Sequence, residues 1–209
     1  MLQFVRIFLI TGCLSAISLS AIAPATNAQL FNSVVDRLPA TERVKLNNGQ
    51  PVVTGNNGKY IARVLISTST DTVWSVLTDY RNTPSFMPHI ELSKVISSSG
   101  NQKTIEQVDS RKVFLVTTRS RIVSAITETP KSRIDFRAID GDIKGLKGYW
   151  LVEPIAPYKG AKANKVLLTQ VVETQPKSGI PSGIFYNIFK NSLGEILTAI
   201  MKESERRTG

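Results

Sequence analysis

Cysteine and histidine are almost absent from this 209-residue sequence, which has one of each, Cys13 and His89. One cysteine cannot form a disulfide within the chain, and a lone histidine without clustered carboxylates does not make a zinc site. A Ser-His-Asp site would require an activated serine beside His89, but no Gly-x-Ser-x-Gly motif is present. We therefore name no catalytic residue, no metal ligand and no cofactor.

Phosphate-binding loops are also missing. Gly141, Gly145 and Gly148 come close together, but no Gly-Lys-Ser follows them and no helical pattern begins there. We interpret these glycines as points of sheet curvature, with close approach of a ligand or helix as the alternative.

Acidic residues are scarce, with 16 Asp and Glu against 26 Lys and Arg, for a net charge of +10. Such basicity is typical of proteins that meet nucleic acid, anionic membranes or acidic ligands. The hydrophobic share of 42% and the length together predict one substantial core rather than two.

The first 28 residues carry one charge, Arg6, followed by an apolar stretch at 7–23 and small residues up to Ala28. This order is typical of a secretory signal peptide, with cleavage before Gln29. It predicts an exported protein in the periplasm, the thylakoid lumen or the extracellular space. Export makes nucleic acid an unsuitable partner and favours an anionic membrane surface for the basic residues.

Two other interpretations of this segment remain open. The apolar stretch of about 17 residues is at the lower limit for a retained membrane anchor. Residues 10–13 also match a lipoprotein box with Cys13 as the lipidated residue, although the chain stays hydrophobic after it, where a mature lipoprotein continues into a polar tether.

Residues 29–58 predict an N-terminal arm and hairpin. Residues 29–42 are expected to be a short helix or arm, and Asn48-Gly49 and Asn57-Gly58 are strong turn signals. They separate short runs with strand character, which we expect to form a three-stranded meander: 43–46, 52–54 and 60–66.

Residues 59–207 predict the main domain. A cluster of N-cap residues at 67–71 and apolar residues at helical spacing predict a helix over 70–79, and the prolines in 80–88 leave room for a single turn. The chain then predicts six antiparallel strands joined by short turns, one of them at 109–110. Their expected ranges are 90–97, 103–109, 112–127, 133–139, 146–153 and 166–174.

A long amphipathic helix ends the chain. It begins near Pro181 and Ser182, and apolar residues recur with a period close to 3.6 up to Met201. Its one apolar face needs a partner, and the sheet is the candidate. The fold class is therefore α+β, with a curved antiparallel sheet wrapped around a long C-terminal helix.

Several segments of the chain resemble one family, the START-like (SRPBCC) proteins, and within it the polyketide cyclase/dehydrase and coenzyme Q-binding START subfamily. The resemblance covers about residues 60–206 and rests on these residues: the run 73–80, Phe86-Met87-Pro88, Glu106-Gln107, Glu128, Ile134-Asp135-Phe136 and Gly148-Tyr149-Trp150. It implies the helix-grip fold and a cavity between sheet and helix sized for a small hydrophobic molecule. The family shares a scaffold rather than one chemistry, so it does not decide the function.

Seven residues are expected to bind the ligand. Arg119 and Arg121 share one face of their strand, which would place a guanidinium in the cavity unless a bulge turns both to solvent. The others are aromatic or apolar residues, and packing alone could also explain them. They lie in the 80–88 segment, which together with the terminal helix is expected to form a gate to the cavity, in the sheet and in the terminal helix: Phe86, Met87, Trp150, Phe185 and Phe189.

The function expected from these observations is an exported binding or carrier protein for a small hydrophobic ligand such as a lipid, isoprenoid or quinone. One alternative is a polyketide cyclase or dehydratase. Another is a membrane-associated assembly factor with a vestigial cavity, whose Lys144–Lys147 and Lys159–Lys165 segments form one basic rim. The oligomeric state stays open.

Overall fold

The computed structural model describes residues 33–113, 116–176 and 181–208. The expected signal peptide, including Cys13, lies outside the described residues. The described chain forms, in order, η1 (Val35–Arg37), α1 (Ala40–Asn47), β1 (Val52–Asn56), β2 (Lys59–Ile66), α2 (Thr70–Leu77), η2 (Tyr80–Asn82), α3 (Thr83–Phe86), β3 (Ile90–Ser99), β4 (Gln102–Val113), β5 (Val116–Thr129), β6 (Arg133–Gly141), β7 (Lys144–Ile155), β8 (Lys165–Gln175) and α4 (Ser182–Arg206).

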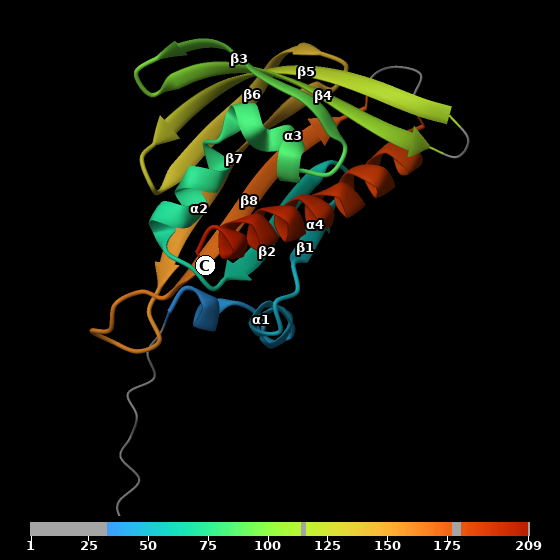
Figure 1. Cartoon of the computed structure of the whole chain (residues 1–209). Coiled ribbons are helices and arrows are strands. Elements are labelled where there is room, and N and C mark those ends of the chain that lie inside the picture. The colour runs from blue at the N-terminus through green and yellow to red at the C-terminus, as the bar shows by residue number, and fades with distance from the viewer. Residues whose placement is uncertain (1–32, 114–115, 177–180, 209) are drawn as a thin grey trace, which may run out of the picture. The chain divides into compact units, whose positions relative to one another are not determined.

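All of the described strands belong to one curved antiparallel sheet (Figure 1). The order across the sheet is β1-β2-β8-β7-β6-β5-β4-β3, so β3 to β8 form a meander and only β2 pairs out of sequence order, with β8. Short turns between successive strands force this antiparallel arrangement. The predicted α+β helix-grip fold is confirmed.

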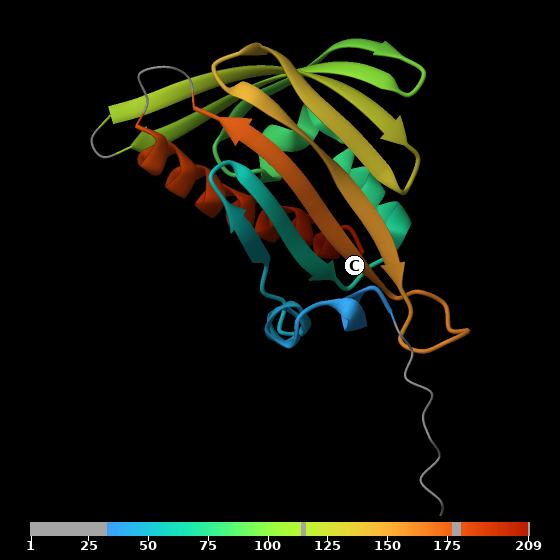
Figure 2. The same ribbon diagram turned by 180° about the vertical axis from the view of Figure 1, so that it is seen from behind.

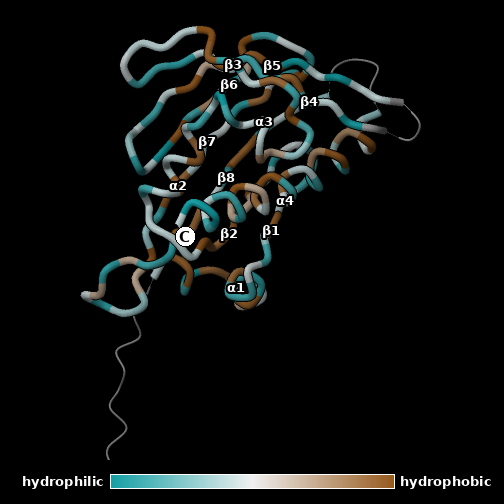
Figure 3. The backbone as a smooth tube through the Cα atoms, in the orientation of Figure 1, coloured by the Kyte–Doolittle hydropathy of each residue, from teal (hydrophilic) through white to brown (hydrophobic). Residues whose placement is uncertain are grey.

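Helix α4 crosses the inner face of the sheet, and Figure 2 shows the same arrangement from behind. Hydrophobic and hydrophilic residues alternate along this helix (Figure 3). Leu193, Leu197 and Ile200 follow helical spacing and are fully buried against strand residues such as Val64 and Leu168. The apolar face of α4 thus finds the partner that its sequence requires.

The segment before β3 differs in detail from the prediction. Helix α2 begins as expected, because the Ser69 side chain accepts a hydrogen bond from the Thr72 backbone N–H at 3.1 Å. The predicted single turn at 80–88 is instead a 3-10 turn, η2, followed directly by the four-residue helix α3. Pro84 fits in α3 because a proline in the first helical turn removes no hydrogen bond.

The N-terminal prediction is partly wrong. The Asn57-Gly58 turn joins β1 to β2 as expected, with both residues at positive φ. Residues 43–46, predicted as a strand, belong to helix α1, so there is no three-stranded meander in this part of the described chain. Gly49 ends that helix at φ +70° rather than turning a hairpin, a common role for glycine after a helix.

The turn predicted at 109–110 is also wrong. Strand β4 continues through these residues to Val113, and Asp109 pairs with Ser120 of β5. The prediction failed because polar residues were interpreted as a turn. Here they occupy strand positions where one of them, Asp109, makes a side-chain ion pair inside the fold.

Candidate functional site

A cavity of about 720 Å³ lies between the sheet, α2, α3 and α4. The strands contribute alternate residues, since neighbouring side chains of a strand point to opposite faces. Most of the side chains that line it are aliphatic or aromatic, for example Leu77, Ile105, Ile122, Leu146 and Ile196. Such a lining suits an apolar molecule and offers few groups for polar chemistry.

Six of the seven predicted ligand-binding residues line this cavity: Phe86, Met87, Arg119, Trp150, Phe185 and Phe189. Phe185 and Phe189 are one helical turn apart on α4, and their rings stack with centroids 5.9 Å apart. The structure thus brings the 80–88 segment, the sheet and the terminal helix together around one cavity, as expected. Their role in ligand binding stays a prediction.

Arg119 and Arg121 do share one face of β5, but that face is the outer one. The cavity receives the intervening residues Thr118, Ser120 and Ile122. The prediction that a guanidinium lies in the cavity is therefore wrong for Arg121, whereas Arg119 lies at the cavity rim. Alternation predicts that both residues share a face, but it does not say which face is inward.

The two arginines pair with carboxylates outside the cavity. Arg121 donates to Glu106 at 2.5 Å and to Asp140 at 2.7 Å, and these hydrogen bonds, chiefly the one to Asp140, raise the pKa of its guanidinium. Arg119 contributes to the cavity rim, but its side chain is 71% exposed and its Nε lies 3.0 Å from Glu91.

The arginine that does lie inside is Arg111 of β4, which the sequence analysis missed. Its Nε donates to Asp109 at 2.7 Å, and its Nη1 donates to the hydroxyl of Ser192 on α4. All three residues line the cavity. The alternation of Ile105, Gln107, Asp109 and Arg111 along one strand was the signal that could have found it.

A second polar group lies toward α2, where Tyr80 lines the cavity. The Tyr80 hydroxyl donates to Glu128 at 2.7 Å, and Lys103 donates to the other carboxylate oxygen at 2.6 Å. Burial, followed by the hydrogen bond to Glu128, raises the pKa of Tyr80 above its ordinary value. Tyr80 thus stays protonated and acts as a hydrogen-bond donor to Glu128.

His89 lies outside the cavity lining, at the start of β3. Its side chain is 40% exposed, and its Nε2 lies 3.7 Å from Glu195 of α4. Within residues 33–113, 116–176 and 181–208, no group of three or more His, Cys, Asp or Glu side chains could hold a metal ion.

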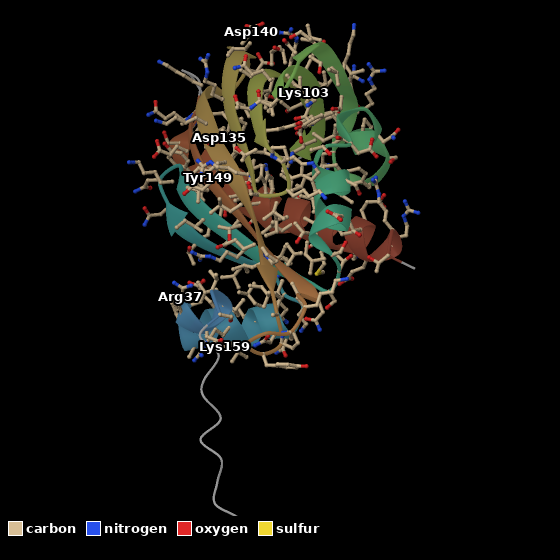
Figure 4. The ribbon with its side chains drawn as sticks, turned by 90° about the vertical axis from the view of Figure 1, so that its left-hand side faces the viewer. Arg37, Lys103, Asp135, Asp140, Tyr149 and Lys159 are labelled. Atoms are coloured by element: carbon tan, nitrogen blue, oxygen red, sulfur yellow. The ribbon has the colours of Figure 1, made fainter. Side chains whose placement is uncertain are left out.

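The two lysine segments predicted to form one basic rim lie at opposite ends of β7, because Lys144 begins this strand and Lys159 follows its end. Figure 4 places Lys159 beside Arg37, at the end of the sheet where η1 and α1 lie. A single rim formed by both segments is therefore wrong.

Residues 66–201 match the family described as polyketide cyclase / dehydrase and lipid transport. This match spans more than half of the chain. The chain belongs to this family. Its members have the START-like architecture, and the resemblance found in the sequence is confirmed.

Solved structures agree with this assignment at the level of fold. A STAR-related lipid transfer protein from Xanthomonas axonopodis is similar with a TM-score of 0.60 and 17% identity, over 74% of this chain and 92% of that one. An aromatase/cyclase from Streptomyces is similar with a TM-score of 0.53 and 17% identity, over 77% and 97%. A START superfamily protein from Mycobacterium smegmatis gives 0.52 and 17%, over 77% and 97%.

At such low sequence identities, these similarities establish the fold of this chain and not its activity. No curated protein matches the chain by sequence. The described part of the chain contains no helix long and apolar enough to cross a membrane.

Proposed function

We propose that this protein binds and carries a small hydrophobic molecule, such as a lipid, an isoprenoid or a quinone, between the sheet and α4. The observation that carries the proposal is the cavity of about 720 Å³ with its largely apolar lining. Burial contributes about 0.8 kcal/mol for each CH₂ group. Roughly ten such groups approach the ~8 kcal/mol of a micromolar complex, before the costs of association.

The state of the polar lining residues favours binding over catalysis. Arg111 is paired with Asp109, and Tyr80 donates to Glu128. A cyclase or dehydratase would need an acid or a base that is free to exchange a proton with its substrate. Because the pKa of Tyr80 is raised, this residue is a weaker acid than an ordinary tyrosine.

We also propose that the protein is exported and that its leader is cleaved after Ala28. Support comes from the order of a basic residue, an apolar stretch and small residues in 1–28. The first described element begins at Val35, so this cleavage would leave every described element intact. The mass of the protein recovered from its native host tests the cleavage, and retention of residues 1–28 would refute it.

Native mass spectrometry of that same preparation is the direct test of the carrier function. We expect a stoichiometric apolar molecule that is lost on denaturation. An empty protein that takes up no lipid, isoprenoid or quinone from an extract would refute the carrier proposal. Conversion of an added polyketide chain to a cyclised product would establish the enzyme alternative.

Two adjacent residues of β5 provide a matched test of where the ligand sits. Ser124 lines the cavity, whereas Ala125 points to the opposite face. Ser124→Trp should fill the cavity and lower binding of the neutral dye Nile red at least tenfold, while Ala125→Trp should leave binding unchanged. Both variants are first checked for folding by circular dichroism. Equal binding by the two folded variants would place the ligand elsewhere.

A further inference from the structure

Gln170 is a polar residue in an apolar part of the cavity wall. It lies in the middle of β8, between the inward-facing residues Leu168 and Val172. Its paired positions on the neighbouring strands are Ala62 of β2 and Trp150 of β7. The residue lines the cavity and is only 7% exposed.

The side-chain oxygen of Gln170 is buried and has no hydrogen-bond partner among the described residues. Thr174 and Ser204 each have a buried oxygen in the same condition, but neither residue lines the cavity. A buried acceptor without a partner is unfavourable, because it gives up its hydrogen bond to water. Among the buried oxygens without a partner in the described residues, that of Gln170 is therefore the one that belongs to the cavity wall.

Three longer polar side chains of the lining already have partners within the protein. The side-chain amide of Gln107 donates to the hydroxyl of Ser93 at 3.4 Å, and the guanidinium of Arg111 donates to Asp109 at 2.7 Å. Asp142 accepts a hydrogen bond from the backbone N–H of Arg121 at 2.9 Å. The charged groups of Arg111 and Asp142 are thus engaged within the protein, which disfavours a charged ligand group in the cavity.

We propose that Gln170 recognises an uncharged hydroxyl group on the hydrophobic ligand. This inference rests on the proposed carrier function and specifies its ligand as an apolar alcohol. A primary amide presents an acceptor at one end and a donor at the other, and a hydroxyl can both donate and accept. The unpaired oxygen of Gln170 requires a hydrogen-bond donor, which a hydroxyl supplies and an ether or a hydrocarbon does not.

The test compares farnesol with its methyl ether as competitors for Nile red bound to the full chain. The two molecules share their apolar chain, but only farnesol has a hydroxyl donor. Wild-type protein should bind farnesol about tenfold more tightly than the ether, a difference of ~1.4 kcal/mol. In Gln170→Met the two affinities should become equal, because methionine keeps the length of the side chain and removes the amide.

Gln107→Met is the matched control, because Gln107 also lines the cavity but its amide already donates to Ser93. This variant should keep the preference for farnesol. The melting temperature of ligand-free Gln170→Met should be equal to or above that of the wild type, since an unpaired buried amide is removed. A lower melting temperature, together with retained preference for farnesol, would show that Gln170 has a structural role instead.

The outcomes separate this inference from the carrier function. If the wild-type protein takes up neither Nile red nor farnesol, both the carrier function and the role of Gln170 are refuted. If the wild type binds farnesol and the ether equally well, the carrier function stands and the role of Gln170 is refuted.

Discussion

Several polar residues beside the cavity are held by specific partners within the protein. Glu128 illustrates this, because both of its carboxylate oxygens are engaged, one by Tyr80 and the other by Lys103. Removing one partner of such a buried ion pair leaves an uncompensated charge, which is more costly than the pair is favourable. These residues thus position the cavity wall, while the apolar side chains between them form the surface that meets a ligand.

Glu203 of α4 is the residue with the clearest consequence for pH dependence. It accepts hydrogen bonds from Arg206 and Arg207, each at 2.8 Å, and Arg207 also donates to Asp79 at 2.8 Å. These contacts, chiefly the hydrogen bond from Arg206, lower the pKa of Glu203 from 4.5 to about 2. The lowered pKa means that the folded protein favours the ionised carboxylate.

The contribution of Glu203 to the free energy of unfolding should therefore be complete above about pH 4.5 and be lost as the pH falls toward 2. Urea unfolding of wild type and Glu203→Gln at several pH values measures this. The wild type should be the more stable protein at pH 7, and the difference should shrink below pH 4.5. Glu205→Gln, at an exposed neighbouring position, is the matched control for the removal of one carboxylate from this turn.

At the scale of elements, α4 depends on the sheet along one face and on α2 at its end. Its apolar residues pack on β2 and β8, and its last turn is joined to the end of α2 through Arg207 and Asp79. An isolated helix of this length would gain little from propensity alone, since most helical stability in proteins comes from packing of the apolar face. The cavity exists because α4 is held against the sheet at this end and at its apolar positions.

Glycines in the sheet and in α4 should respond to substitution in opposite ways. A Cβ at Gly148 of β7 would lie 2.0 Å from the backbone oxygen of Val171 and 2.9 Å from the ring of Phe136. Gly148→Ala should therefore lower the free energy of unfolding by about 2 kcal/mol or more. A Cβ at Gly194 of α4 meets nothing within 4 Å, so Gly194→Ala should raise it by up to ~1 kcal/mol.

Urea denaturation of the two variants checks this pair of predictions. A neutral Gly148→Ala would show that the strands can separate locally without cost. The contact of β7 with β8 at this position would then not require glycine. Destabilisation by Gly194→Ala would show that α4 packs more tightly around this residue than its open surroundings indicate.

At the scale of the whole described unit, helices pack on both faces of the sheet, although the outer face is covered only at one end. Helix α4 packs on the inner face, and η1 and α1 pack on the opposite face at one end of the sheet. Leu46 of α1 is 1% exposed and belongs to a cluster with the outward-facing Leu65 and Leu167. The N-terminal segment thus contributes to the same fold as the cavity.

Leu46→Ala should lower the free energy of unfolding by about 2–5 kcal/mol, because it removes a fully buried side chain. Val44 lies on the same helix and is 60% exposed. Val44→Ala should change the free energy by no more than ~0.5 kcal/mol. Thermal or urea unfolding measures both variants. A small effect of Leu46→Ala would mean that α1 packs only weakly and that the arm can be removed without loss of the fold.

Most of the fold follows from local patterns in the chain. The alternation in β3 to β8 and the helical period in α4 each create an apolar surface that only the other can cover, so the sheet and the terminal helix were predictable. The run 73–80 with the later segments predicted the family. Five of the ligand-binding candidates could be found because large apolar residues on these two surfaces must point toward each other.

Tertiary structure decided the remaining features. Alternation predicts that Arg119 and Arg121 share a face, but only the pairing of β5 with β4 determines that this face is outward and that Arg111 lies inside. Residues 43–46 form a helix because Leu46 packs on the outer face of the sheet, a distant contact that local preference does not contain. The alternation of a strand shows which residues share a face, but it does not show which face is buried. A short segment takes the secondary structure that its packing partner stabilises.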